Sequence, residues 1–86
     1  MNIFKYEVLP GTNRVNLPQS SKVLSAGIQG DSIFIWALVD DSNDMQDIEI
    51  LVTGTGHNID NDLARQLNFV DTVFAGDFVW HVFERH

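Results

Sequence analysis

The sequence predicts a mainly β domain, either a small barrel or a two-layer sandwich of about six or seven antiparallel strands with at most one short helix. Short runs rich in Val, Ile and aromatic residues recur at regular spacing along the chain. Glycine-containing turn signals separate these runs, and one segment alone has apolar residues at helical spacing. Short strands joined by tight turns are typical of small β sandwiches and barrels.

The first two strands are predicted near the N-terminus. In residues 3–8, IFKYEV, apolar and charged side chains alternate, which is the pattern of a strand with one solvent-exposed face. Pro10, Gly11 and Pro18 surround residues 14–17. We therefore expect a turn that leads into a brief edge strand at residues 14–17.

Two hairpins are predicted from glycine–aspartate pairs. Gly30 and Asp31 separate two apolar runs in KVLSAGIQGDSIFIWALVD, and both residue types tolerate the backbone angles of a tight hairpin turn. Gly76 and Asp77 stand in the same way between the runs FVDTVFA and FVWHVFE. Each run is predicted to be a strand.

A further strand, DIEILVT, is predicted between the two hairpins, and it runs into a glycine-rich bend. Residues 58–67, NIDNDLARQL, form the one credible helix. Asp60 or Asn61 could cap it, and Leu63 and Leu67 lie four residues apart on one face. An ordered loop is the alternative for this segment.

Two strands carry apolar side chains on both faces, because alternate residues of a strand point in opposite directions. In residues 33–39, Trp36 lies on the face opposite Ile35. In residues 78–84, one face holds Phe78, Trp80 and Val82, and the other holds Val79, His81 and Phe83. A second apolar face in so small a domain is covered by a loop, a helix or another subunit. We therefore predict a homodimer or higher oligomer, with Trp80 as a candidate core residue.

Length and composition predict a single domain over residues 1–86. The chain has no cysteine, which fits a reducing compartment, and it contains neither a signal peptide nor a membrane span, so we expect a cytoplasmic protein. Twelve acidic and five basic residues give a net charge of −7. The basic residues are scattered and form no footprint for phosphates, so direct nucleic-acid binding is not expected: Lys5, Arg14, Lys22, Arg65 and Arg85.

Five carboxylates gather in DDSNDMQDIE: Asp40, Asp41, Asp44, Asp47 and Glu49. A calcium-binding loop does not fit, since a register that begins at Asp40 has Met45 where glycine is needed and Leu51 where a carboxylate is needed. Charge runs commonly form solvated loops. The alternative is an acidic patch that docks on a basic surface of a partner protein.

A second candidate site is the bend VTGTGHN together with a distant histidine. Its candidate ligand-binding residues are Thr53, Gly54, Thr55, Gly56, His57 and His81. Glycine lets backbone N–H groups approach an anion, and Thr and His side chains add donors. The bend lacks the spacing and the lysine of a P-loop, and no nucleophile lies near a base, so we predict no catalytic residue, metal or cofactor. A β-bulge or turn that requires glycine is the structural alternative.

For His81 the favoured interpretation is structural. The ring is expected to pack with Val79 and Phe83, with one nitrogen bonded to a backbone carbonyl or a carboxylate. A partner contact, a ligand contact or catalysis are the alternatives. The other imidazoles, His57 and His86, stand at a spacing that matches no recognised metal site.

The blocks IFKYEV, IQGDSIFIWALVD, TGTGHNI and FVDTVFAGDFVWHVFE resemble those of a small uncharacterised protein family of bacteriophages and prophages. The order W-A-L-V, then G-T-G-H, then V-W-H-V-F-E covers nearly the whole chain. The resemblance places Trp36, His57, Trp80 and His81 at the family's marked positions. It implies a phage-encoded cytosolic accessory protein and supplies no mechanism.

Two function classes follow. The first is a protein-binding module that engages a host or phage protein, for example as a modulator or inhibitor of a host defence protein. The second is a small-ligand or anion-binding domain, or a minor hydrolase, that uses the bend at residues 54–57 together with His81. The acidic charge, the two-sided apolar strands and the lack of an assembled catalytic set favour the first class over an enzyme.

Overall fold

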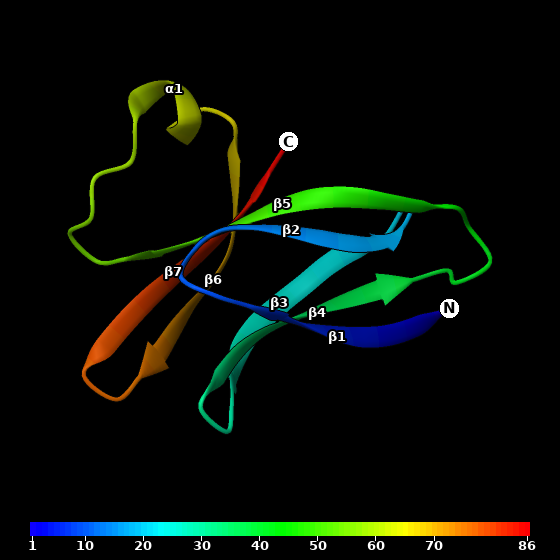
Figure 1. Cartoon of the computed structure of the whole chain (residues 1–86), viewed down its shortest axis with the longest axis horizontal. Helices are drawn as coiled ribbons and strands as arrows, with labels where there is room; N and C mark the ends of the chain where they lie inside the picture. Colours follow the sequence, from blue (N-terminus) through cyan, green and yellow to red (C-terminus); the bar gives the residue numbers. More distant parts are fainter.

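The computed structural model describes all residues 1–86 and contains seven strands and one short helix (Figure 1). The elements are β1 (Asn2–Val8), β2 (Gly11–Pro18), β3 (Lys22–Gln29), β4 (Ser32–Val39), β5 (Met45–Gly54), α1 (Asn61–Ala64), β6 (Leu67–Ala75) and β7 (Phe78–Arg85). None of the helical structure has the length and apolar character that crossing a membrane as a helix would require.

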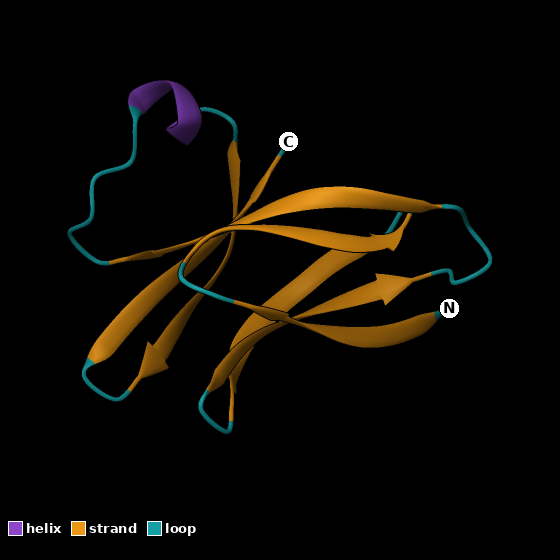
Figure 2. Ribbon diagram, in the orientation of Figure 1, coloured by secondary structure: helices purple, strands orange, loops and turns teal.

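The strands form two antiparallel sheets that face each other as the layers of a sandwich (Figure 2). One sheet has the order β1-β4-β3 and the other β2-β5-β7-β6. The edges β3 and β6 approach each other, and the Ala26 N–H donates to Asp71 Oδ2 at 3.2 Å, but no ladder joins the two sheets. The predicted mainly β class is confirmed, and of the two architectures the chain adopts the sandwich rather than a closed barrel.

Both predicted hairpins form, each with a two-residue turn. Gly30 and Gly76 have φ angles of 62° and 59°, whereas Asp31 and Asp77 lie outside the positive-φ region. Positive φ at the first turn residue alone is the type II′ pattern, which matches the twist of the flanking strands. The turns at these two glycines therefore set the β3–β4 and β6–β7 registers as far as the irregularities between Val23 and Ser25 and between Phe69 and Asp71, where each register shifts.

The core lies between the sheets and consists of nine buried residues: Val8, Val15, Leu17, Ile33, Ile35, Ile50, Val52, Val73 and Val82. The predicted alternation on β4 holds, with Ile35 buried and Trp36 on the outer face. On β7, Val82 is fully buried, whereas Trp80 is half-buried and packs against the edge of the core. Trp80 thus covers the core instead of lying within it.

Three predicted boundaries are corrected. β2 is longer than residues 14–17, because it pairs with β5 along its whole length, from Gly11 to Pro18. β5 begins at Met45, earlier than predicted, because this pairing starts at the pair of Pro18 with Met45. The helix over residues 58–67 is reduced to α1, and Leu67 belongs to β6.

Asp60 caps α1, as one of the two predicted alternatives. Its carboxylate accepts hydrogen bonds from the backbone N–H groups of Asp62 and Leu63. These are donors that the first turn of a helix leaves without intrahelical partners. The cap explains why a single turn forms here between two strands.

Apolar side chains remain on the outer faces of both sheets. The Trp36 ring lies against Gly27, where an added Cβ would approach the ring carbon Cζ3 to 3.3 Å. The Lys5 ammonium lies 4.7 Å from the centroid of the Phe34 ring. On β6, Phe69 and Phe74 are 62% and 72% exposed. Phe34 and Trp36 are partly covered, whereas Phe69 and Phe74 are left largely open to solvent.

Candidate functional site

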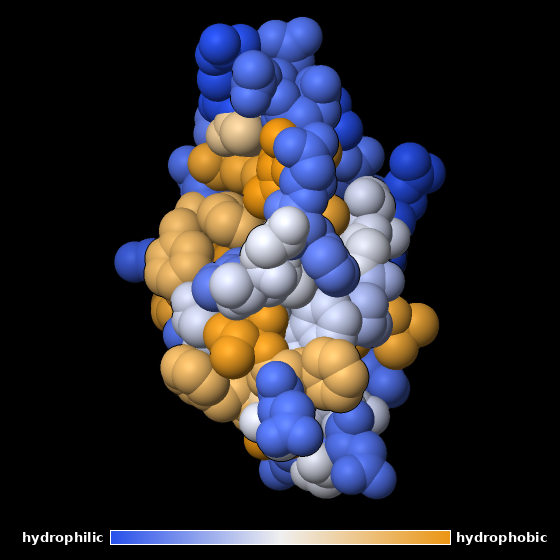
Figure 3. All heavy atoms as spheres, turned by 90° about the vertical axis from the view of Figure 1, so that its left-hand side faces the viewer, coloured by the Kyte–Doolittle hydropathy of each residue, from blue (hydrophilic) through white to orange (hydrophobic).

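All six residues of the predicted ligand site line one open pocket of about 190 Å³. They are Thr53, Gly54, Thr55, Gly56, His57 and His81, and the structure adds Ile59 and Phe83. The β5–β7 register places the pocket on the outer face of the four-stranded sheet. Figure 3 looks from the left-hand side of Figure 1, where the bend after β5 lies, and shows apolar residues beneath the hydrophilic segment around α1.

The glycine-rich bend is a tight turn at the end of β5. The His57 N–H donates to the carbonyl of Gly54 at 3.2 Å, and Gly56 has a φ of 86°. Positive φ at the third residue of such a turn is the type II pattern, which strongly favours glycine. The Thr55 N–H donates to the Val79 carbonyl at 3.2 Å and so continues the pairing of β5 with β7.

The ring of His57 packs closely on Gly54, and a larger residue there would have to displace it. A Cβ added at Gly54 would lie 3.1 Å from Cε1 and 3.2 Å from Nδ1 of the His57 ring, closer than ordinary van der Waals contact. The turn therefore folds the imidazole back over the backbone of β5. This close approach makes the ring of His57 part of the pocket wall.

His81 is held by two threonine hydroxyls and not by the predicted carbonyl or carboxylate. Its Nε2 lies 2.7 Å from Thr55 Oγ1, and its Nδ1 lies 3.2 Å from Thr72 Oγ1. A hydroxyl both donates and accepts, so one threonine can serve the ring N–H and the other the bare nitrogen. No three His, Asp or Glu side chains are placed to hold one metal ion.

Replacing His81 by alanine is expected to lower the free energy of unfolding by about 1 kcal/mol, because both ring hydrogen bonds are lost. Urea denaturation of the variant and of wild type measures this difference. His57→Ala is the matched control, since its side chain is exposed and should change stability by less than about 0.5 kcal/mol. A His81→Ala protein as stable as wild type would contradict the structural role.

The predicted acidic segment divides between a loop and a strand. Asp40, Asp41 and Asp44 lie in the connection from β4 to β5, which links the two sheets. Asp47 and Glu49 lie on β5. The interpretation of the whole segment as one solvated loop is therefore wrong, because the pairing of β2 with β5 already includes these last two residues.

The loop is ordered by its own hydrogen bonds. The Ser42 hydroxyl and N–H donate to Asp40 Oδ1 at 2.6 and 3.1 Å. These bonds, first that of the hydroxyl, hold the pKa of Asp40 below its ordinary value. The Asn2 side-chain amide donates to Asp41 Oδ2 at 3.3 Å, and that of Asn43 to the Gln19 carbonyl at 3.0 Å. Asp40 thus shapes the loop.

The carboxylates differ in how far their charges are compensated. Glu49 forms an ion pair with Arg85 at 3.1 Å. Asp47 accepts a hydrogen bond from the neutral Asn16 amide at 2.9 Å, and the Asp44 carboxylate has no bonding partner. Asp41, Asp44 and Asp47 therefore present exposed negative charges with no cation paired to them.

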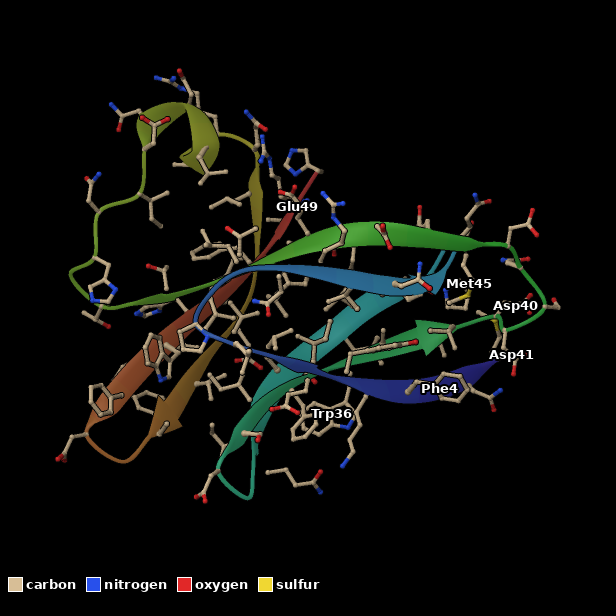
Figure 4. All side chains as sticks on the ribbon, in the orientation of Figure 1. Phe4, Trp36, Asp40, Asp41, Met45 and Glu49 are labelled. Atoms are coloured by element: carbon tan, nitrogen blue, oxygen red, sulfur yellow. The ribbon has the colours of Figure 1, made fainter.

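Two exposed apolar residues lie at the end of the sandwich that carries the acidic loop, and the sequence did not indicate either of them as a site residue. Phe4 and Met45 are 41% and 53% exposed. Figure 4 places both at the end of the sandwich that also carries Asp40 and Asp41. Met45 stands in the chain between Asp44 and Asp47, so an apolar side chain lies among the uncompensated carboxylates.

One carboxylate outside the acidic segment is perturbed by its surroundings. Glu84 on β7 pairs in register with Ile50 and Asn68. Burial raises the pKa of Glu84, and the charge of His86 opposes part of that effect. Desolvation likewise raises the pKa of Tyr6.

Glu84→Gln is expected to raise the melting temperature at neutral pH. A raised pKa means that the folded protein binds the proton more tightly than the unfolded chain, so stability falls as pH rises from 4.5 through the raised value. The increase in melting temperature from glutamine should therefore be largest at a pH above the raised pKa and absent below about pH 4. Thermal melts across this range measure it, with Asp77→Asn in an exposed turn as the control. A loss of stability at neutral pH would contradict the expectation.

The fold and these features define a small β-sandwich domain with two candidate binding regions, an acidic end and an open pocket. The chain belongs to the family described as "Domain of unknown function (DUF7352)", whose model matches residues 1–86. This confirms the predicted resemblance at the level of a family of unknown function. No curated protein and no solved structure matches the chain.

Proposed function

We propose that this domain is a protein-binding module whose acidic end docks on a basic surface of a partner protein. The observation that carries the proposal is the exposed side chain of Met45 among carboxylates that have no cationic partner: Asp41, Asp44 and Asp47. Protein interfaces combine an apolar centre with charges at the rim. Rim charges mainly speed association and select the partner.

We further propose a phage origin for the domain and a host or phage protein as its partner. The resemblance of the sequence blocks to a phage family supports a phage-encoded accessory protein that acts in the host cytoplasm. Its partner is then a host or phage protein, for example a host defence protein that it inhibits or modulates. The net charge of −7 makes a basic protein surface a better partner than a nucleic acid.

The test uses the triple variant Asp41→Asn, Asp44→Asn, Asp47→Asn. Asparagine keeps the side-chain oxygens that accept from Asn2 and Asn16, so the fold and melting temperature should be unchanged. The immobilised wild type is expected to retain a stoichiometric partner from infected-cell lysate, which the variant binds with slower association and weaker salt dependence.

The matched control removes three charges elsewhere, with Asp31→Asn, Asp62→Asn and Asp77→Asn, all at exposed positions. This control should bind the partner like wild type. Equal loss in both triple variants would mean that net charge, and not the acidic end, governs association. Equal binding by all three proteins would remove the acidic end as the docking surface.

A second candidate function rests on the pocket. The residues predicted from the sequence to bind a ligand converge on one hollow, which two glycines, two threonines and two histidines line. This arrangement supports a small-ligand or anion-binding site at residues 54–57 and His81.

Titration with inorganic phosphate, followed by amide NMR, tests the second candidate. Binding at the pocket should shift the amide signals of Gly54, Gly56 and His57 in a saturable way. His57→Ala should weaken the response, whereas Phe74→Ala on the exposed part of β6 should not. Shifts that are absent, or spread over the whole surface, would remove phosphate-like anions as ligands.

A further inference from the structure

The sandwich has two free edges, β1 in the three-stranded sheet and β2 in the four-stranded sheet. The remaining edge strands, β3 and β6, lie against each other and are joined by the Ala26–Asp71 hydrogen bond. A free edge presents unpaired backbone N–H and C=O groups, which are a template for another strand. β1 is open along most of its length, since the side chains of Asn2 to Lys5 are all exposed.

We propose that β1 pairs antiparallel with β1 of a second copy of the chain, so that two three-stranded sheets become one continuous sheet. In an edge strand, the free hydrogen-bonding groups belong to every second residue. Two residues that face each other in a twofold-symmetric pair must therefore both belong to that set, or both lie outside it. The twofold axis must therefore pass through one residue position, where that residue of one copy faces the same residue of the other copy.

Charge selects the register centred on Tyr6. In that register Lys5 of each copy faces Glu7 of the other on the outer face. Two opposite-charge pairs form there when the Lys5 ammonium, which in the single chain lies over the Phe34 ring and donates to the Gln29 side chain, turns toward the free edge. Centres at Lys5 or Glu7 place like charges directly opposite each other, which destabilises a cross-strand pair. A centre at Phe4 places Lys5 opposite Ile3 and brings Glu7 only to the chain end at Met1, so it pairs no side chains of opposite charge.

The same register covers apolar side chains that are exposed in the single chain. Phe4 of one copy faces Val8 of the other, and Ile3 faces Leu9. Phe4, Ile3 and Leu9 are 41%, 60% and 62% exposed in the single chain. Removing this area from water favours association. Beyond β1, the apolar outer face around Trp36 continues into the second copy.

The alternative edge is less suitable. β2 begins at Gly11, with a φ of 103°, and ends at Pro18, which has no N–H to donate. Arg14 is its one charged residue, so no symmetric register of β2 brings opposite charges together. Because the β1 strands run antiparallel in the dimer, the two acidic ends lie far apart and stay free for the partner.

Sedimentation velocity from about 1 μM to about 1 mM protein tests the dimer. Wild type should shift with concentration from the 9.7 kDa chain to a species of twice that mass. Lys5→Glu and Glu7→Lys each convert both attractive pairs into repulsive ones and should weaken dimerisation about tenfold or more. The double variant restores the pairs with the charges exchanged and should dimerise like wild type.

Mixing the two single variants gives a sharper result. One variant then offers two acidic side chains and the other two basic ones, so a heterodimer should form where each variant alone is monomeric. Lys22→Glu is the control, because it makes the same charge change on the opposite edge strand of this sheet and should leave dimerisation intact.

Two results would overturn the proposal. One is a wild-type chain that remains monomeric over the whole range, and the other is a dimer that both single reversals leave intact. Lys5 and Glu7 are exposed, so the variants should remain folded, which circular dichroism checks. Formation of the heterodimer tests the β1–β1 pairing, whatever the stability of each single variant. Its absence would also overturn the proposal.

Discussion

Ile50→Ala is expected to lower the free energy of unfolding by about 2–5 kcal/mol, the range for removing a large aliphatic side chain from a packed core. Ile50 is fully buried on β5, a central strand of the four-stranded sheet. It belongs to the core cluster that both sheets share. A domain of this size is only marginally stable, so a large fraction of the variant is expected to be unfolded near physiological temperature.

Chemical denaturation measures the Ile50→Ala effect, and Phe74→Ala is the control. Phe74 also lies in the four-stranded sheet, but it is 72% exposed and should cost less than about 1 kcal/mol. Similar losses from both variants would show that the inward and outward faces of the sheet are assigned wrongly.

Trp80→Ala is expected to cost about 3 kcal/mol, the lower end of the range for truncating a buried tryptophan. The Trp80 ring stacks on Phe78, with centroids 6.1 Å apart, and packs against the core. It also lines a groove between the two sheets together with Val8 and Ile33, so its removal would open the core to water there.

The second tryptophan provides a matched comparison. Trp36 lies on the outer face of β4, against Gly27, and its replacement by alanine should cost no more than about 1 kcal/mol. Thermal and urea unfolding of both variants measure the difference. A melting temperature of Trp80→Ala within a couple of degrees of wild type would contradict its role as a cover of the core.

The hairpins could be predicted from the sequence because their signals are local. A two-residue turn with positive φ needs glycine, and Gly30 and Gly76 each stand between apolar runs. The pairing of β1 with β4 and of β2 with β5 has no such signal. Alternation tells which face of a strand is buried and not which strand lies beside it, so the full length of β2 and the early start of β5 could not be predicted.

The candidate site was predictable to the extent that its residues are close in sequence or in hairpin register. Counting back from the turn at Gly76 and Asp77 places Thr72 opposite His81, so this partner could have been found from the sequence. Ile59 could not, because its position depends on how the segment after β5 folds over the sheet. Phe83 shares a face of β7 with His81, as strand alternation predicts, although its place in the pocket wall was not foreseen. The Glu49–Arg85 ion pair likewise depends on the pairing of β5 with β7.

The order of strands along the chain also has consequences for synthesis and folding. β1 and β2 are made first, yet Asn2 pairs with Val39 and Gly11 with Val52. Closing such long loops costs chain entropy before any contact compensates for it, whereas the two hairpins can close locally and early. In a nascent chain β1 therefore stays unpaired until β4 has left the ribosome, and β2 stays unpaired until β5 has. The complete sandwich is expected to form on the slow, millisecond-to-second timescale of proteins dominated by non-local strand pairing.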